Sequence, residues 1–96
     1  MEAYDVDLRA GDLERVYQPG VSLYLGRGGG CTVPLAFDTF VSQVHARAFD
    51  RDGALWVEDL GSRNGTFVNE QPVHEPTYAG KGARIRVGET VLEVDR

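Results

Sequence analysis

The chain has 96 residues, 42% hydrophobic and 26% charged, a length that suits a single small globular domain and excludes two. Fifteen acidic side chains against ten basic ones give a formal net charge of −5, which argues against a general binder of nucleic acids or anionic membranes. Cys31 is the lone cysteine and His45 and His74 are the two histidines, so neither an internal disulfide, a zinc site nor another cofactor is expected. The absence of a long apolar run or a secretory pattern predicts an intracellular, cytoplasmic location without membrane insertion.

Twelve glycines separate short segments rich in Val, Leu, Tyr and Phe, which is typical of short strands joined by turns. We predict strands over residues 4–8, 13–17, 21–25, 32–35, 44–49, 54–58, 66–68, 83–87 and 90–94. Apolar residues nowhere recur with helical spacing over a dozen positions. The pattern therefore predicts an all-β domain of about ten strands, arranged as a sandwich.

Turn signals in chain order predict how these strands connect. Residues 1–20 form an opening hairpin, and Pro34 confines the fourth strand to a sheet edge because proline lacks the N–H that a central strand donates. A four-residue loop, 50–53, closes the central hairpin, whereas 69–82 is turn-rich and weakly patterned. Trp56 is expected to fill the core and Asp59 to accept hydrogen bonds in a turn.

Two residue groups invite an enzymatic interpretation, and both fail on chemical grounds. The glycine-rich loop 26–30 resembles a phosphate-cradling loop, but the Lys-Ser/Thr ending of a P-loop and a following helix are both missing. Ser42 and His45 suggest a nucleophile and its base, but no nucleophile elbow surrounds the serine and the two side chains should point in opposite directions. His45 is better explained as a histidine whose ring nitrogens tie loop backbone together.

The order and spacing of three segments are more specific than any one of them. Leu25-Gly26-Arg27, the run 41–47 (VSQVHAR) and the run 59–69 (DLGSRNGTFVN) together resemble the forkhead-associated (FHA) domain, with a family-like glycine hairpin at Gly88. The resemblance implies an eleven-stranded β-sandwich of two twisted sheets with binding loops at one end. It also implies one domain over 1–96 that recognises phosphothreonine peptides made by an upstream Ser/Thr kinase, and no enzymatic activity.

The family pattern assigns a role to individual residues of this chain. Arg27 would be the main phosphate donor, Ser42 would donate its hydroxyl to phosphate, and Asn64 would bond the peptide backbone. Arg63 and Gln43 would lie beside the phosphate. The supporting residues would be Gly26, His45, Gly65 and Asn69.

Two departures from the family pattern keep an alternative open. Gln43 stands where a charged or asparagine side chain is common, and three glycines follow Arg27. The alternative is an FHA-fold scaffold that makes protein contacts independent of phosphorylation. Phe40 is expected either to contact an apolar side chain of the peptide or to lie in the core, and Arg47 to extend the positive patch of Arg27 and Arg63.

Overall fold

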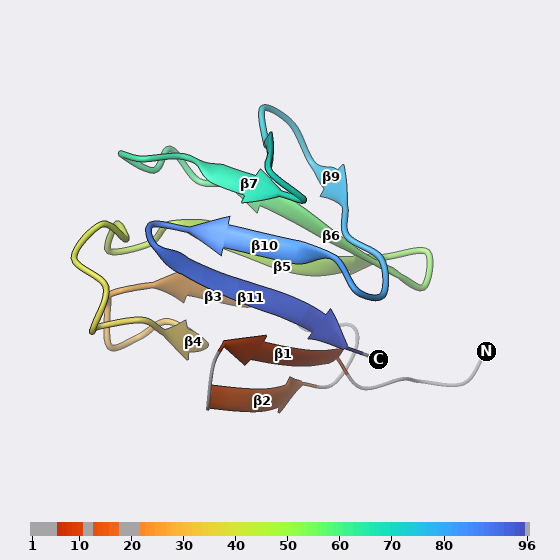
Figure 1. Ribbon diagram of the computed structural model, residues 1–96, viewed down its shortest axis with the longest axis horizontal. Coiled ribbons are helices and arrows are strands. Elements are labelled where there is room, and N and C mark those ends of the chain that lie inside the picture. Colours follow the sequence, from red (N-terminus) through yellow and green to blue (C-terminus); the bar gives the residue numbers. More distant parts are fainter. Residues whose placement is uncertain (1–5, 11–12, 18–21, 96) are drawn as a thin grey trace.

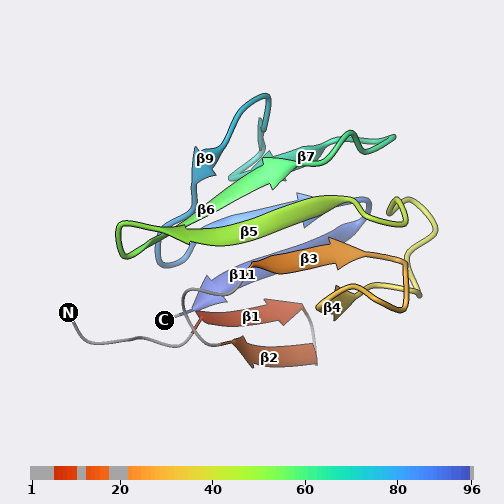
Figure 2. The ribbon, with the colours of Figure 1, turned by 180° about the vertical axis from the view of Figure 1, so that it is seen from behind.

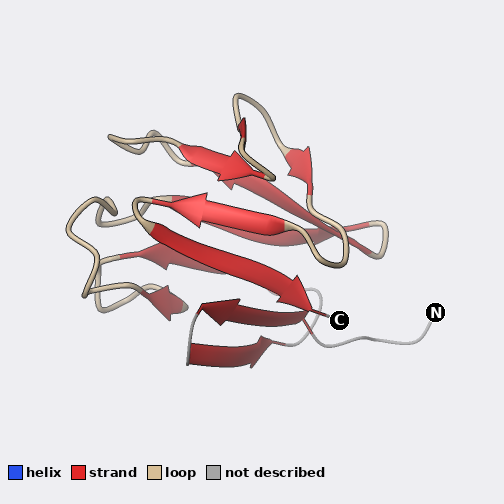
Figure 3. Cartoon of the chain, in the orientation of Figure 1, coloured by secondary structure: helices blue, strands red, loops and turns tan. Residues whose placement is uncertain are grey.

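The computed structural model describes residues 6–10, 13–17 and 22–95, and Figure 3 shows that this part of the chain consists of strands, turns and loops. Within these ranges no helix is long and apolar enough to cross a membrane. The strands in chain order are β1 (Val6–Ala10), β2 (Leu13–Tyr17), β3 (Leu23–Gly26), β4 (Val33–Pro34), β5 (Ala46–Arg51), β6 (Ala54–Asp59), β7 (Thr66–Val68), β8 (Gln71–Pro72), β9 (Thr77–Tyr78), β10 (Arg84–Val87) and β11 (Thr90–Asp95). The prediction of an all-β fold is confirmed.

Two sheets form the sandwich. One sheet has the strand order β2-β1-β11-β10-β7-β8, and the other has the order β4-β3-β5-β6-β9. Figure 1 shows the first sheet in front of the second, and Figure 2 shows the same layers from behind. All neighbouring strands are antiparallel except β3 and β4, and β4 lies at a sheet edge, as Pro34 predicted.

Alternating side chains bury the inner face of each sheet. In β3 and β5 the buried residues include Leu23, Leu25 and Ala46, and in β10 they are Ile85 and Val87. A fully buried aliphatic side chain contributes about 1.5–3 kcal/mol relative to an exposed one. This core between the sheets therefore provides most of the apolar stabilisation and leaves the connecting loops free to carry polar groups.

The opening hairpin is confirmed over the residues that the structure describes. β1 pairs with β2 from Val6 opposite Tyr17 to Ala10 opposite Leu13. The turn predicted at residues 10–12 was placed one residue too early, because Ala10 is still in β1 and pairs with Leu13. Residues 11–12, and residues 4–5 of the predicted first strand, lie outside the described ranges. β1 also pairs with β11, so the hairpin extends the larger sheet.

Parts of the predicted strand layout were wrong. β5 begins at Ala46 instead of Val44, because the backbone of residues 42–45 bonds to β3 and its loop instead of continuing the ladder. The turn between β5 and β6 is the two-residue pair Asp52-Gly53, with φ of 54° and 80°, instead of a four-residue loop. The two-residue strands β8 and β9 lie within the turn-rich segment 69–82, where no strand was predicted.

Trp56 was also predicted wrongly. Its neighbours Leu55 and Val57 face the core, so the pleat directs Trp56 to the outer face of the five-stranded sheet. There its ring packs edge-on against Tyr78, and the guanidinium of Arg51 stacks over it.

Candidate functional site

Four connecting loops gather at one end of the sandwich, on the left in Figure 1. We call this region the loop end and define it as residues 27–32, 35–45, 60–65 and 88–89. β3 and β6 run into it and β5 and β7 run out of it, so all three segments of the sequence motif meet there. Residues 27–32 are termed the glycine loop and residues 60–65 the Asn-Gly loop.

Arg27 begins the glycine loop and is held at two points. Its backbone N–H donates to the carbonyl of Ser42 at 3.0 Å, and its side-chain Nε donates to the carbonyl of Val41. Within the described part of the chain, no group bonds to its terminal guanidinium nitrogens. The anchored side chain can therefore present a forked pair of donors to an anion.

Gly26 and Gln43 are in close backbone contact. A Cβ on Gly26 would lie 2.2 Å from the Gln43 carbonyl oxygen, so no other residue fits without displacing the backbone. That same oxygen accepts hydrogen bonds from the Gly28 N–H at 3.0 Å and from Cys31 Sγ at 3.2 Å. The glycine loop is thus fastened to residue 43, whose side chain is exposed.

Ser42 contacts the Asn-Gly loop through its hydroxyl. Its Oγ accepts a hydrogen bond from the backbone N–H of Arg63 at 3.0 Å. Because that N–H occupies an acceptor lone pair of the oxygen, the hydroxyl proton remains available to donate elsewhere. Arg63 itself is exposed, and its backbone thereby sets the position of Ser42.

His45 is fully buried and joins two loops. Its Nδ1 accepts from the backbone N–H of Ser42 at 3.0 Å, and its Nε2 lies 2.8 Å from the carbonyl of Gly65. An amide can only donate and a carbonyl can only accept, so Nε2 carries the proton. The ring bonds to the Ser42 backbone and not to its hydroxyl, so this geometry does not form a nucleophile–base pair.

Asn64 crosses between loops as well. Its Nδ2 donates to the carbonyl of Phe40 at 2.7 Å, and the side chain is otherwise exposed. Gly65, next to it, has a φ of +87°, which satisfies the turn that the Asn-Gly pair predicted. Phe40 is half exposed, so the expectation that it lies in the core was wrong.

Asp59 orders the Asn-Gly loop from the end of β6. One carboxylate oxygen accepts from the backbone N–H groups of Gly61 and Ser62, both at 3.0 Å. The other accepts from the hydroxyls of Ser62 and Thr66. Burial would raise the pKa of Asp59, but these hydrogen bonds outweigh it and lower that pKa below its ordinary value. The sequence predicted an acceptor here, though not the link to Thr66.

Asp38 is a buried carboxylate that the sequence did not reveal. It accepts from the backbone N–H groups of Phe40 and Glu89, both at 2.9 Å, and from the hydroxyl of Thr90 at 2.6 Å. Burial opposes ionisation, yet these hydrogen bonds lower the pKa of Asp38 overall. Asp38 thereby fastens the loop before Phe40 to the turn between β10 and β11. The one local sequence signal for this role is that an aspartate often begins a turn by accepting a hydrogen bond from the N–H two residues ahead.

Two predicted residues lie elsewhere. Asn69 follows β7, away from Gly65, and its Oδ1 accepts from the backbone N–H of Arg84 at the start of β10. Arg47 lies in β5 with its Nε 2.9 Å from Glu58, and its guanidinium stacks over Phe49. Its charge is therefore already paired, and the positive groups of the loop end are Arg27 and Arg63.

Comparison with known proteins places the chain in a family. The family model for the FHA domain matches residues 23–88. FhaB from Mycolicibacterium smegmatis is 39% identical over 70 residues, which cover 73% of this chain and 44% of FhaB. The chain therefore spans less than half the length of this relative.

Solved structures agree in fold. One, from a structural and functional analysis of phosphothreonine-dependent FHA domain interactions, shares 33% identity and a TM-score of 0.84 and covers 97% of both chains. The FhaA FHA domain, solved in complex with the intracellular domain of Rv3910, shares 34% identity and a TM-score of 0.80, covering 93% of this chain and 98% of that one. The chain belongs to the FHA domain family, whose members are known as phosphothreonine-binding modules.

Proposed function

We propose that this protein is a phosphothreonine-dependent recognition module that recruits a partner after a Ser/Thr kinase has acted on it. The contact set is Arg27, Ser42, Gln43, Arg63 and Asn64, with Gly26, His45 and Gly65 as the scaffold at the loop end, while Asn69 holds β7 to β10 farther away. A phosphothreonine carries about −1.5 to −2 charges and strong acceptor oxygens. Its recognition by a protein of net charge −5 requires local donors, and the loop end gathers them.

The observation that carries the proposal is the anchoring of Arg27. With Nε held by the Val41 carbonyl, the terminal nitrogens are oriented before any ligand binds. The Ser42 hydroxyl is fixed by the Arg63 N–H in the same region, so two donors are positioned together. Because preorganised donors lose less side-chain entropy on binding, they bind an anion of matching geometry more tightly. The solved FHA relative studied for phosphothreonine-dependent interactions supports the same ligand class.

The test is a fluorescence-anisotropy titration with three degenerate peptide pools, carrying phosphothreonine, phosphoserine or unmodified threonine at the centre. We expect saturable binding of the phosphothreonine pool with a Kd on the order of micromolar, weakening as salt is added. Burying the threonine methyl group is worth about 0.8 kcal/mol, so the phosphoserine pool should bind up to about fourfold more weakly. The unmodified pool should not bind.

Matched arginine variants locate the site. Arg27→Ala should weaken binding of the phosphothreonine pool at least about tenfold, because a charge-assisted forked pair is lost. Arg84→Ala removes the same charge from an exposed side chain at the other end of β10 and should leave affinity within about twofold. Equal binding of all three pools, or none, would contradict the proposal and favour the phosphorylation-independent scaffold.

A further inference from the structure

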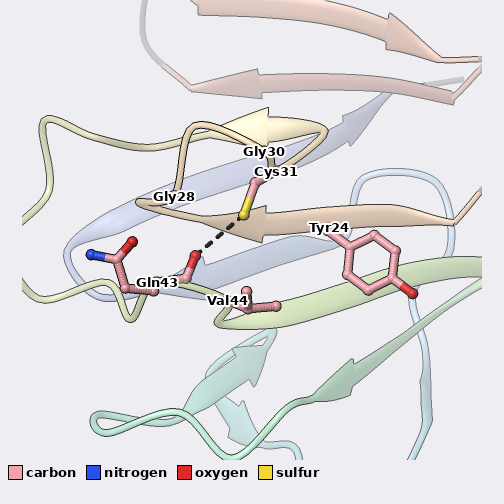
Figure 4. A pocket seen from close by; sticks show the side chains of 6 residues that line it. All are labelled: Tyr24, Gly28, Gly30, Cys31, Gln43 and Val44. Atoms are coloured by element: carbon pink, nitrogen blue, oxygen red, sulfur yellow. Dashed lines mark hydrogen bonds between the residues drawn. The ribbon is translucent and has the colours of Figure 1, made fainter.

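A mainly apolar hollow lies beside the glycine loop, on the outer face of the five-stranded sheet. Its volume is about 360 Å3, and it is lined by Tyr24, Gly28, Gly30, Cys31, Gln43 and Val44. Figure 4 shows Tyr24 from β3, Cys31 from the glycine loop and Val44 from the segment before β5 around it, with Gln43 at the end away from Tyr24. No charged side chain lines it.

The hollow exists because the glycine loop has no side chains to fill it. A Cβ added to Gly30 would meet no atom within 4 Å, so the space beside this residue is open. The walls are apolar groups that the fold leaves in water: Tyr24 is 40% exposed and Val44 is 49% exposed. Covering such groups is favourable, whereas a charged ligand group would lose hydration there without a partner.

The hollow and the proposed phosphate site share a residue. Gln43 lines the hollow and directly follows Ser42, and the Gln43 carbonyl holds both Gly28 and Cys31 of the hollow's wall. A peptide residue in extended conformation spans at most about 3.6 Å, so ligand residues within a few positions of the phosphothreonine can reach this wall. A volume near the lower end of the range for ligand pockets suits one side chain.

We propose that the hollow binds one apolar side chain of the phosphothreonine ligand, within about four residues of the phosphothreonine. This inference rests on the proposed function and adds a sequence preference to it. The recognised partner is then a phosphoprotein with a leucine-like residue near its phosphothreonine, held by Tyr24, Val44 and the backbone of the glycine loop. Phe40 does not line the hollow, so the proposal gives it no part in binding this apolar side chain.

The test uses oriented phosphothreonine pools in which one position, from four before to four after the phosphothreonine, is fixed as leucine or as alanine. At one position the leucine pool should bind about tenfold more tightly, since three further carbon groups become partly buried. Gly30→Leu should remove that preference by occupying the hollow, while binding of the alanine pools stays within about twofold. Val44→Asp should also remove it, by placing a charge in the wall.

Gly29→Leu is the matched control. Gly29 is the neighbouring glycine, is equally free of contacts at an added Cβ and does not line the hollow, so the leucine preference should persist in this variant. Thermal unfolding of each variant identifies loss of fold. As a second readout, the leucine pool should slow alkylation of Cys31, the sole cysteine, more than the alanine pool does.

The remaining outcomes separate the two proposals. If phosphothreonine pools bind but leucine and alanine are equivalent at every position, the hollow is not a subsite. A preference that survives Gly30→Leu but is lost in Phe40→Ala places the apolar side chain at Phe40 and overturns the inference. If no phosphothreonine pool binds at all, the proposed function itself fails.

Discussion

The two loops that contribute arginines to the loop end are held in opposite ways. The Asn-Gly loop is fixed by side chains: the carboxylate of Asp59 accepts four hydrogen bonds, and the buried ring of His45 bonds the Gly65 carbonyl. The glycine loop is held at its ends, by backbone bonds of Arg27 and Gly28 to residues 42 and 43 and by the Cys31 thiol. Gly29 and Gly30 between these anchors have no neighbour within 4 Å of an added Cβ.

The two loops therefore have different roles: the Asn-Gly loop positions side chains, whereas the glycine loop leaves open space beside it. The polar network of the Asn-Gly loop sets where Arg63 and Asn64 lie, and it loses stability if any member is removed. The glycine loop instead keeps an arginine anchored at its first residue and leaves space at its tip. We infer that the first loop is sensitive to substitution throughout, whereas the second tolerates substitution at its tip.

The largest expected effect follows from removing the ring that joins the loops. His45→Ala leaves the Ser42 N–H and the Gly65 carbonyl without their partners in a buried region and opens a cavity. We expect the free energy of unfolding to fall by roughly 3 kcal/mol in urea denaturation. His74→Ala, at an exposed histidine, should change it by less than about 0.5 kcal/mol. Equal effects of the two substitutions would contradict the bridging role of His45.

The next largest effect tests the network within the Asn-Gly loop. Asp59→Ala removes the acceptor of two backbone N–H groups and two hydroxyls, and should lower the free energy of unfolding by about 2 kcal/mol. Glu75→Ala removes a charge of the same sign from an exposed position and should leave stability almost unchanged. If Asp59→Ala lowered the free energy of unfolding no more than Glu75→Ala does, water would be replacing the hydrogen bonds of Asp59 without loss of stability.

Sequence patterns predicted the scaffold because its determinants are local. Alternation placed Leu23 and Leu25 inward, and Asn64-Gly65 identified a tight turn. Alternation failed for β8 and β9, because two-residue strands are too short to show a period. It failed again at Val44, which continues the apolar pattern of β5 but lies in the segment that bonds to the glycine loop.

The organisation of the loop end depends on contacts that are distant in the chain. Asp38 bonds Thr90, 52 residues away, and Asn64 bonds Phe40, 24 residues away. Such pairs have no periodic or spacing signal in one sequence. The family resemblance supplied candidate site residues, but not that Arg27 is anchored by the Val41 carbonyl or that a hollow lies beside Gly28 and Gly30.

A smaller effect on stability, confined to low pH, is expected from the two carboxylates that hold the loops, Asp38 and Asp59. Hydrogen bonds lower the pKa values of Asp38 and Asp59 in the folded state below the ordinary value of 3.8. Their stabilisation is therefore fully present above that value and is lost as the pH falls through the folded-state pKa, where the unfolded chain binds more protons. In urea denaturation between pH 6 and 2, Asp59→Asn should flatten the fall in stability below about pH 4. An unchanged slope would show that Asp59 is not hydrogen-bonded as an anion.

The smallest effects compare glycines at the two loops directly. Neither Gly29 nor Gly61 has an atom within 4 Å of an added Cβ, so sterics are matched and only the backbone differs. Gly61 has a φ of +76°, in the left-handed region, whereas Gly29 lies outside that region. Gly61→Ala should therefore destabilise the protein by about 1 kcal/mol, because an L-residue is strained there. Gly29→Ala should stabilise it by about 0.5 kcal/mol, because alanine reduces the conformational freedom of the unfolded chain. Opposite signs in parallel urea titrations would establish that the tip of the glycine loop tolerates a side chain and the Asn-Gly loop does not, whereas destabilisation by both would mean that the glycine loop also requires a conformation only glycine adopts.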